Sequence, residues 1–280
     1  MSLAIVYTRA ALGIEAPLIT VEVHLSNGLP GLTMVGLPET TVKEARDRVR
    51  SALINSGYAF PAKKITINLA PADLPKEGGR YDLPIALALL VASEQLNTTR
   101  LNQYEFVGEL ALTGGLRGVP GAIPSAMEAI KAGRRIVVSS DNAAEVGLIG
   151  GSDCLVADHL QEVCAFLAGQ TSLSPPLAEA PARDERYEDL LDVIGQQQGK
   201  RALEIVAAGG HNLLLIGPPG TGKTMLASRL PGLLPPLSNQ EALESAAIQS
   251  LVNLHTAKTR WRQRPFRAPH HSASLAAMVG

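Results

Sequence analysis

The stretch Gly217-Pro218-Pro219-Gly220-Thr221-Gly222-Lys223-Thr224 has the spacing G-x-x-x-x-G-K-[ST], which is typical of a loop that binds nucleotide phosphates. The apolar run at 212–216 precedes this loop and predicts a buried parallel strand. The run at 225–230 follows it and predicts the first turns of a helix. Strand, glycine-rich loop and helix therefore come in the order that a phosphate-binding loop requires.

Each residue type in this loop suits the binding of phosphate. The three glycines lack a Cβ, so the backbone can bring successive N–H groups close to a phosphate, and the N-terminus of the helix adds a partial positive charge. Lys223 is placed to neutralise the β- and γ-phosphates, and the hydroxyl of Thr224 can help to coordinate a Mg²⁺ ion that bridges them. The sequence therefore predicts an ATP site with Mg²⁺. A glycine-rich turn without a ligand is the alternative, and the flanking segments do not favour it.

The composition narrows the class of protein. With 280 residues, 46% of them hydrophobic, the chain is long enough for two domains with a sizeable core. The 25 basic and 26 acidic residues nearly cancel, so no overall field points to nucleic acid or to a membrane. The longest apolar run, at 83–92, is about half the length that a bilayer crossing needs. Two cysteines and no secretory start indicate a reduced, cytoplasmic protein without a membrane partner.

The first 170 residues alternate predicted strands and helices, which is the pattern of an α/β domain. Apolar and polar residues alternate over 19–25 and predict a strand with one buried face, which resumes at 32–35. Thr41 and Glu44 form a capping box that predicts the start of a helix ending near Gly57. The further predicted elements are a strand at 64–69, a helix from Tyr81, a strand at 105–112, a helix with Pro124 in its first turn that runs to Gly133, strands at 135–138 and 155–157, and a helix that is capped by Asp158 with Gln161 and ends at Gly169.

Two basic segments need an interpretation. The polar face of the helix after Thr41 carries Lys43, Arg46, Arg48 and Arg50, and such a face is more typical of a solvated helix surface than of a ligand site. The segment 255–271 holds five cations and no acidic residue, together with Trp261 and Phe266; the cations are Lys258, Arg260, Arg262, Arg264 and Arg267.

Residues 171–186 change in character, because they are rich in proline and serine and lack an apolar period. They predict an exposed linker between a domain at 1–170 and a second domain at 187–280, in which 200–208 and 241–254 predict helices. After Asp192 the chain has no aspartate, and Glu241 and Glu244 follow no apolar strand. The acidic pair that positions Mg²⁺ and polarises water is therefore not identified. We expect a chain truncated before that motif, which binds ADP or ATP weakly and does not hydrolyse it.

Three segments carry a resemblance to a known family: the phosphate loop, the run DVIGQQQGKRALE at 192–204 and the run RPFRAPHHSAS at 264–274. They resemble the ATPase module of the magnesium-chelatase-like AAA+ family and, more narrowly, its ComM/YifB branch. The resemblance covers the whole chain and implies that the protein continues past Gly280. It implies an α/β fold in which an α+β domain similar to the Lon protease domain, with a ribosomal S5 domain 2-like fold, is followed by the start of a P-loop AAA+ α/β domain. It also assigns Val193 and Ile194 to an adenine pocket and 217–224 to phosphates and Mg²⁺.

The likeness to Lon proteases does not extend to their catalytic pair. Those peptidases use a serine just after a Pro-Lys-acid-Gly loop and a lysine at the start of a later helix. The matching runs here, at 75–82 and 121–124, place Arg80 and Ile123 at the two positions. Arginine cannot attack a carbonyl and isoleucine cannot accept a proton, so the resemblance implies a scaffold without peptidase activity. Ser125 and Lys131 are the nearby residues that a shifted alignment would bring in.

The resemblance also implies a function for the whole protein. The family branch suggests an ATPase and DNA helicase that drives branch migration on recombination intermediates during natural transformation, and that works as a homo-hexameric ring with branched or single-stranded DNA as partner. The cations of 255–271 would then meet phosphates, and Trp261 would stack on a base, although an ordinary solvated basic segment has the same composition. The alternatives are a magnesium chelatase subunit that helps to insert Mg²⁺ into a porphyrin, an ATP-dependent Lon-like protease, and an ATP-binding assembly module without motor activity.

Overall fold

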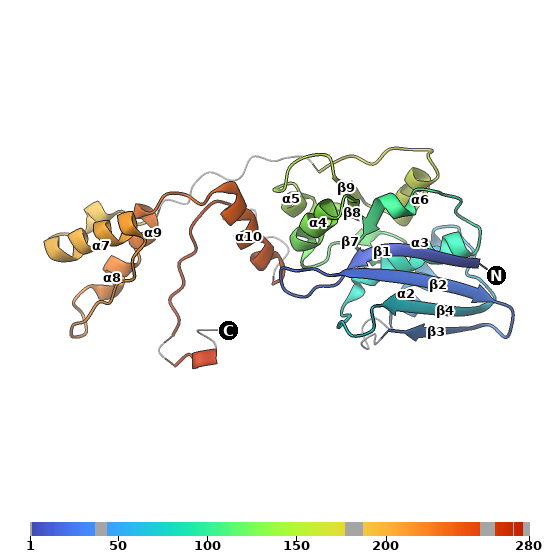
Figure 1. The fold of residues 1–280 in the computed structure, drawn as a ribbon, viewed down its shortest axis with the longest axis horizontal. Helices are drawn as coiled ribbons and strands as arrows, with labels where there is room; N and C mark the ends of the chain where they lie inside the picture. The colour runs from blue at the N-terminus through green and yellow to red at the C-terminus, as the bar shows by residue number, and fades with distance from the viewer. Residues whose placement is uncertain (1, 37–43, 177–186, 253–260, 271, 277–280) are drawn as a thin grey trace. The chain divides into compact units, whose positions relative to one another are not determined.

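The structure is a computed structural model that describes residues 2–36, 44–176, 187–252, 261–270 and 272–276 (Figure 1). By their contacts the residues divide into two compact units. One unit contains residues 1–181 together with 243–261, and the other contains 182–242 together with 262–280. The boundaries that we expect near residues 170 and 187 stay a prediction, since the first unit also takes in a segment from the second half of the chain.

The first unit is built on a seven-stranded sheet with the strand order β3-β4-β2-β1-β5-β8-β9. Four of the six pairs of neighbouring strands are parallel, and the pairs β1–β2 and β2–β4 are antiparallel. The strands are β1 Ser2–Arg9, β2 Leu18–Ser26, β3 Gly31–Val35, β4 Lys64–Ala70, β5 Tyr104–Phe106, β8 Arg135–Ser139 and β9 Cys154–Ala157. A separate two-stranded sheet joins β6 Glu109–Leu110 to β7 Leu116–Arg117. The expectation of an α/β fold is confirmed.

Helices cover both faces of this sheet (Figure 1). The buried side chains of α2 Ala45–Asn55, α3 Asp82–Ala92 and α6 Leu160–Leu167 share one hydrophobic cluster with the strands β1, β2 and β4. A second cluster joins α4 Ala122–Lys131 and the short α5 Ala143–Val146 to β8 and β9. Successive residues of β8 divide between the clusters, because neighbouring side chains on a strand point to opposite faces. No helix in the described part of the chain is long and apolar enough to cross a membrane.

Helix α3 lies at the centre of the first cluster. Ten of its eleven residues are buried, because the run from Leu83 to Ala92 is apolar on every side. A helix without a polar face is stable only when other elements surround it, so α3 fixes where β1, β2 and α2 pack.

Several sequence expectations in this unit need correction. The strand expected at 105–112 is two strands, β5 and β6, which belong to different sheets. Helix α6 begins after His159, whose Nδ1 accepts a hydrogen bond from the N–H of Gln161 at 3.2 Å, so Asp158 is not its cap. The Asp158 carboxylate instead accepts a hydrogen bond from Ser140. Thr41, the first residue of the expected capping box, lies outside the described residues.

The start of the expected linker lies against the sheet. The N–H of Val156 donates to the carbonyl of Ser174 at 3.1 Å, and Leu173 packs against the first cluster. Residues 177–186 lie outside the described ranges. The proline-rich composition of the segment therefore did not reveal that its first residues extend the packing of β9.

A buried ion network crosses the sheet next to β5. The carboxylate of Glu105, which is fully buried, accepts hydrogen bonds from Arg9 Nε at 2.6 Å and Nη2 at 2.8 Å, and from Arg134 Nε at 2.9 Å. The guanidinium of Arg134 lies over the ring of Tyr7, 4.7 Å from its centre. These contacts tie β1, β5 and the start of β8 together at one place.

The second unit is helical in the described ranges, with α7 Gln197–Gly209, α8 Lys223–Ala227, α9 Leu230–Leu233 and the first residues of α10 Asn239–Ser250. Its small core contains Val193, Leu203 and Leu226. The strand expected at 212–216 is not formed, and the side chains of Leu214 and Ile216 are 81% and 87% exposed. A strand needs a neighbour to satisfy its backbone hydrogen bonds, and no described segment pairs with this one.

Candidate nucleotide-binding site

The phosphate loop has the backbone shape that its glycines predict. Gly220 and Gly222 both have φ near +80°, a conformation in which a side chain would be strained. Helix α8 begins directly after the loop, at Lys223. The glycine-loop-to-helix half of the predicted motif is therefore present, while the strand before it is not.

The ammonium group of Lys223 lies inside the loop. Its Nζ donates to the carbonyl of Gly217 at 2.8 Å and to that of Pro218 at 2.7 Å. The hydroxyl of Thr221 donates to the same Pro218 carbonyl at 2.9 Å. The loop is therefore closed around a positive charge, and both of the lysine's carbonyl acceptors are exposed and replaceable by phosphate oxygens.

Segment 192–204 lies beside this loop. Gln196 Nε2 donates to the carbonyl of Thr221 at 3.3 Å, and α7 approaches α8 so closely that a Cβ on Gly199 would lie 2.9 Å from Leu226 Cδ1. The two residues expected to line an adenine pocket, Val193 and Ile194, differ in their exposure to solvent. Val193 is buried in the small core, whereas the side chain of Ile194 is 96% exposed. Only Ile194 therefore offers a surface on which an adenine ring could lie.

The groups around the loop fit a nucleotide that carries Mg²⁺. The donors are an ammonium group, backbone N–H groups and the exposed hydroxyl of Thr224, which match phosphate oxygens and a magnesium ion that prefers oxygen ligands. When bound, ATP with Mg²⁺ supplies a phosphoanhydride bond whose cleavage releases free energy. No group of three or more His, Cys, Asp or Glu side chains forms a metal site among the described residues.

Glu241 caps the start of a helix. The N–H of Ser238 donates to Glu241 Oε2 at 2.8 Å, and the N–H of Glu241 is 3.3 Å from Ser238 Oγ. These bonds from Ser238 lower the pKa of the Glu241 carboxyl. The pair is a capping box at the start of α10, which is a structural use of this carboxylate.

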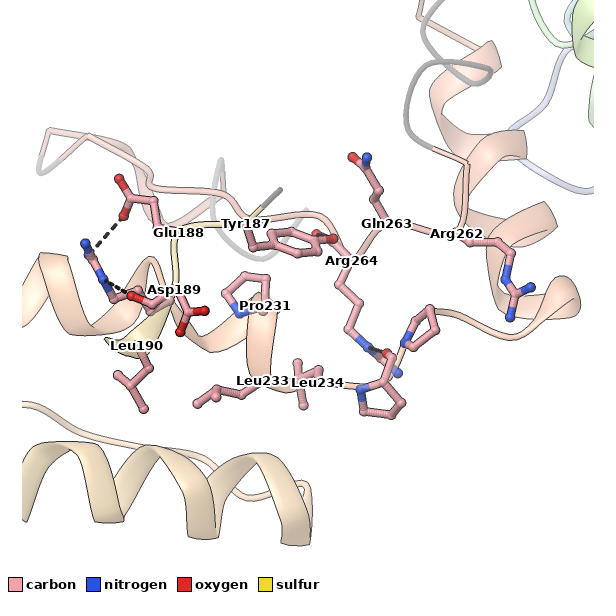
Figure 2. A pocket seen from close by; sticks show the side chains of 14 residues that line it. Tyr187, Glu188, Asp189, Leu190, Pro231, Leu233, Leu234, Arg262, Gln263 and Arg264 are labelled. Atoms are coloured by element: carbon pink, nitrogen blue, oxygen red, sulfur yellow. Dashed lines mark hydrogen bonds and ion pairs between the residues drawn. The ribbon is translucent and has the colours of Figure 1, made fainter. Parts of the chain in front are cut away.

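A cavity of about 420 Å³ in the second unit was not predicted from the sequence (Figure 2). Figure 2 shows Leu190, Leu233 and Leu234 grouped on one side of it. On the other side the hydroxyl of Tyr187 donates to the carbonyl of Arg264 at 3.2 Å. The residues around it come from 187–190, 229–236 and 262–264, and no periodic pattern signals that segments so far apart meet.

The basic segment after α10 makes contacts within the chain. Arg262 Nε donates to the carbonyl of Leu237 at 2.9 Å, and Arg264 Nε donates to that of Pro235 at 2.7 Å. Trp261 packs beside Ile123, Ala246 and Ala247 in the first unit. Lys258 and Arg260 lie outside the described residues. The described part of this segment therefore has structural contacts that its composition did not predict.

The two positions that the resemblance aligns with the catalytic pair of Lon proteases are buried. Arg80 is buried and donates to the carbonyls of Arg9, at 3.2 Å, and Pro120. Burial lowers the pKa of the Arg80 guanidinium. Ile123 is fully buried against Ala246 and Ala247 of α10.

Ser125 and Lys131, which a shifted alignment would place at the catalytic positions, also form contacts with other groups. Ser125 is buried, and its hydroxyl donates to the carbonyl of Gly121 at 2.8 Å. Lys131 pairs with Glu128 at 2.6 Å on the surface of α4. Neither contact joins a serine to a lysine.

Comparison with known proteins places both parts of the chain in one family. Residues 21–142 match the family model "Subunit ChlI of Mg-chelatase", and residues 189–280 match "Magnesium chelatase, subunit ChlI". Among similar proteins, YifB of Salmonella typhimurium is 77% identical over 280 residues and YifB of Escherichia coli is 75% identical over the same length. The competence protein ComM of Haemophilus influenzae is 58% identical over 287 residues.

These alignments cover 100% of this chain and 55% or 56% of the relatives, so the chain spans about half the length of the curated proteins it matches. The second family model and the three alignments span the motifs at 192–204, 217–224 and 264–274. The chain belongs to the magnesium-chelatase ChlI-type family that includes ComM and YifB.

Proposed function

We propose that the chain is the nucleotide-binding part of an ATP-driven motor that remodels DNA. The observation that carries the proposal is the closed loop at 217–222, with the Lys223 ammonium inside it and helix α8 directly behind it. The bond from Gln196 to Thr221 supports it, because that bond brings a second family motif to the same place.

Binding would use the residues of the loop in separate roles. Lys223 would exchange its two carbonyl acceptors for phosphate oxygens, and Thr224 would complete the coordination of Mg²⁺. Ile194 would cover the base. The chain itself would bind nucleotide without turning it over, because it has no aspartate after Asp192 and Glu241 is used as a cap. Assembly into a homo-hexameric ring belongs to the same proposal for the whole protein.

The DNA partner rests on the relationship to the competence protein ComM, at 58% identity. The magnesium chelatase alternative has its own support, since both matching family models carry the name of a chelatase subunit. Magnesium insertion into a porphyrin and movement of a DNA branch are separate reactions, so assays of the two distinguish the alternatives.

The proposal is tested with the whole protein that contains this chain and its Lys223→Ala variant. We expect the unaltered protein to move a labelled Holliday junction in the presence of ATP and Mg²⁺, and the variant to show no more than background. Arg201→Ala, which removes a charge paired with Glu204 on the surface of α7, serves as the control. Equal activity of the Lys223→Ala variant would contradict the proposal, and porphyrin metallation without branch movement would favour the chelatase.

We also propose that the first unit is a scaffold without peptidase activity. Arg80 and Ile123 are buried, and neither side chain can supply a nucleophile or a base. Incubation of the protein with fluorescein-labelled casein, with and without ATP, is expected to release no more fluorescent peptide than buffer alone. Release that disappears in a Ser125→Ala variant would show that a different pair of residues acts as the catalytic dyad.

A further inference from the structure

A small basic hollow lies on the first unit. Its volume is about 170 Å³, and it lies between the start of β3, helix α2 and the chain before β4. Arg46 and Arg50 of α2 and Lys63 line it, together with Phe60. None of the described residues that line it is acidic. Three positive charges therefore face one concave site.

The arginines of α2 are used in two different ways. Arg48 points toward the core, where its Nε and Nη2 donate to the buried carboxylate of Asp82 at 2.7 Å and 3.1 Å. Arg46 and Arg50 are exposed, and neither forms an ion pair with a carboxylate of the described residues. The segment 37–43, which lies outside the described ranges, contributes one glutamate and one lysine to the sequence, so its charges cancel. The basic face expected to be a plain solvated surface therefore contains one structural arginine and two that line a hollow.

Phe60 holds one of these arginines in place. The guanidinium of Arg50 lies over the half-buried ring of Phe60, 5.1 Å from its centre. A guanidinium plane that is stacked on one side offers its other side to a planar group, and nucleobases bind to proteins on such surfaces. Arg46 and Lys63 remain for phosphate oxygens, which arginine and lysine both bind well.

We propose that this hollow binds single-stranded nucleic acid, with the phosphates on Arg46 and Lys63 and a base on the Arg50–Phe60 stack. The site is independent of the nucleotide site, because it lies in the other unit and uses none of its residues. Two like charges one turn apart on a helix destabilise it when no anion is present. A ligand that carries phosphates removes that repulsion. The two arginines therefore favour binding of the ligand while they lower the stability of the helix without it.

The test uses the 280-residue chain without ATP and a fluorescently labelled oligothymidylate, followed by anisotropy over a range of salt concentrations. The double variant Arg46→Ala/Arg50→Ala is expected to bind about tenfold more weakly at low salt. It is also expected to lower the slope of log K against log salt by about 0.7, since of these two arginines only Arg46 contacts a phosphate and each neutralised phosphate on a single strand contributes about 0.7. The melting temperature of the double variant is expected to be equal to or higher than that of the unaltered chain. The loss of affinity would therefore not come from unfolding.

Two control variants distinguish loss of this site from a change in net charge and from loss of the nucleotide site. Arg100→Ala/Lys131→Ala removes the same number of charges from exposed positions on other elements, and it is expected to change affinity by less than about twofold. Lys223→Ala is expected to bind the oligonucleotide as the unaltered chain does, which keeps this result distinct from the proposed ATP site. Equal losses in both double variants, an unchanged affinity in Arg46→Ala/Arg50→Ala, or binding to phosphatidylserine vesicles in place of the oligonucleotide would each overturn the proposal.

Discussion

Replacing Lys223 with alanine is expected to weaken the binding of Mg-ADP and Mg-ATP to this chain about a hundredfold. That factor corresponds to about 2.7 kcal/mol, which is within the range of a hydrogen bond to a charged group, about 1.5–3 kcal/mol. The Nζ of this lysine lies within the loop, 2.8 Å and 2.7 Å from the carbonyl oxygens of Gly217 and Pro218. Isothermal titration of nucleotide into the two proteins measures the difference.

The control for this experiment is Arg201→Ala. Arg201 lies on the surface of α7 and pairs with Glu204 at 2.9 Å, so its removal changes the net charge of the unit without touching the loop. Because the acceptors of Lys223 are exposed carbonyls, water replaces the lysine in the variant and its melting temperature should stay within a few degrees of the original. A Lys223→Ala protein that binds nucleotide as tightly as the control would show that the loop is not the phosphate site.

Replacing Glu105 with alanine is expected to destabilise the first unit by about 4 kcal/mol. The substitution leaves the buried guanidinium of Arg9 without its carboxylate and also removes the partner of Arg134. An unpaired charge in the interior lowers the free energy of unfolding by far more than the intact pair raises it. Removal of one partner typically lowers it by about 3–5 kcal/mol. Urea denaturation followed by far-UV circular dichroism, fitted for the unit that contains the sheet, measures the change.

Glu128→Ala is the matched control for the buried network. Its carboxylate pairs with Lys131 at 2.6 Å on the surface of α4, and an exposed pair of this kind contributes about 0.5 kcal/mol. The backbone carbonyl of Glu128, which accepts a hydrogen bond from Arg9, is unchanged by the substitution. If both variants lost the same small amount of stability, the network at Glu105 would not hold the sheet together.

The sequence predicted the elements whose pattern is local. The alternation at 19–25 became β2, and its buried side chains are those expected. Two of the three glycines of the phosphate loop, Gly220 and Gly222, have the positive φ that glycine adopts most readily. By contrast β1 was not predicted, because apolar residues occur on both of its faces, and Leu3 remains 63% exposed beside the buried Ala4. Without alternation, a short apolar strand at the start of a chain gives no periodic signal.

The errors of prediction concern partners that lie far away in the sequence. The run at 212–216 has the composition of a buried strand, but composition does not supply a neighbouring strand. Helix α10 was predicted, whereas its packing on Ile123 was not, since no pattern in either segment identifies the other. The basic hollow was missed for the same reason: Arg46 and Lys63 belong to separate elements, and only the fold brings them to one site.

Residues 217–224 are expected to bind the phosphates of a nucleotide, and amide hydrogen exchange of this chain with and without Mg-ADP tests this binding. We expect slower exchange over 217–227 on addition of Mg-ADP, and no such slowing in Lys223→Ala. Exchange that stays the same over 217–227 while nucleotide is bound, or slowing confined to the seven-stranded sheet, would contradict it.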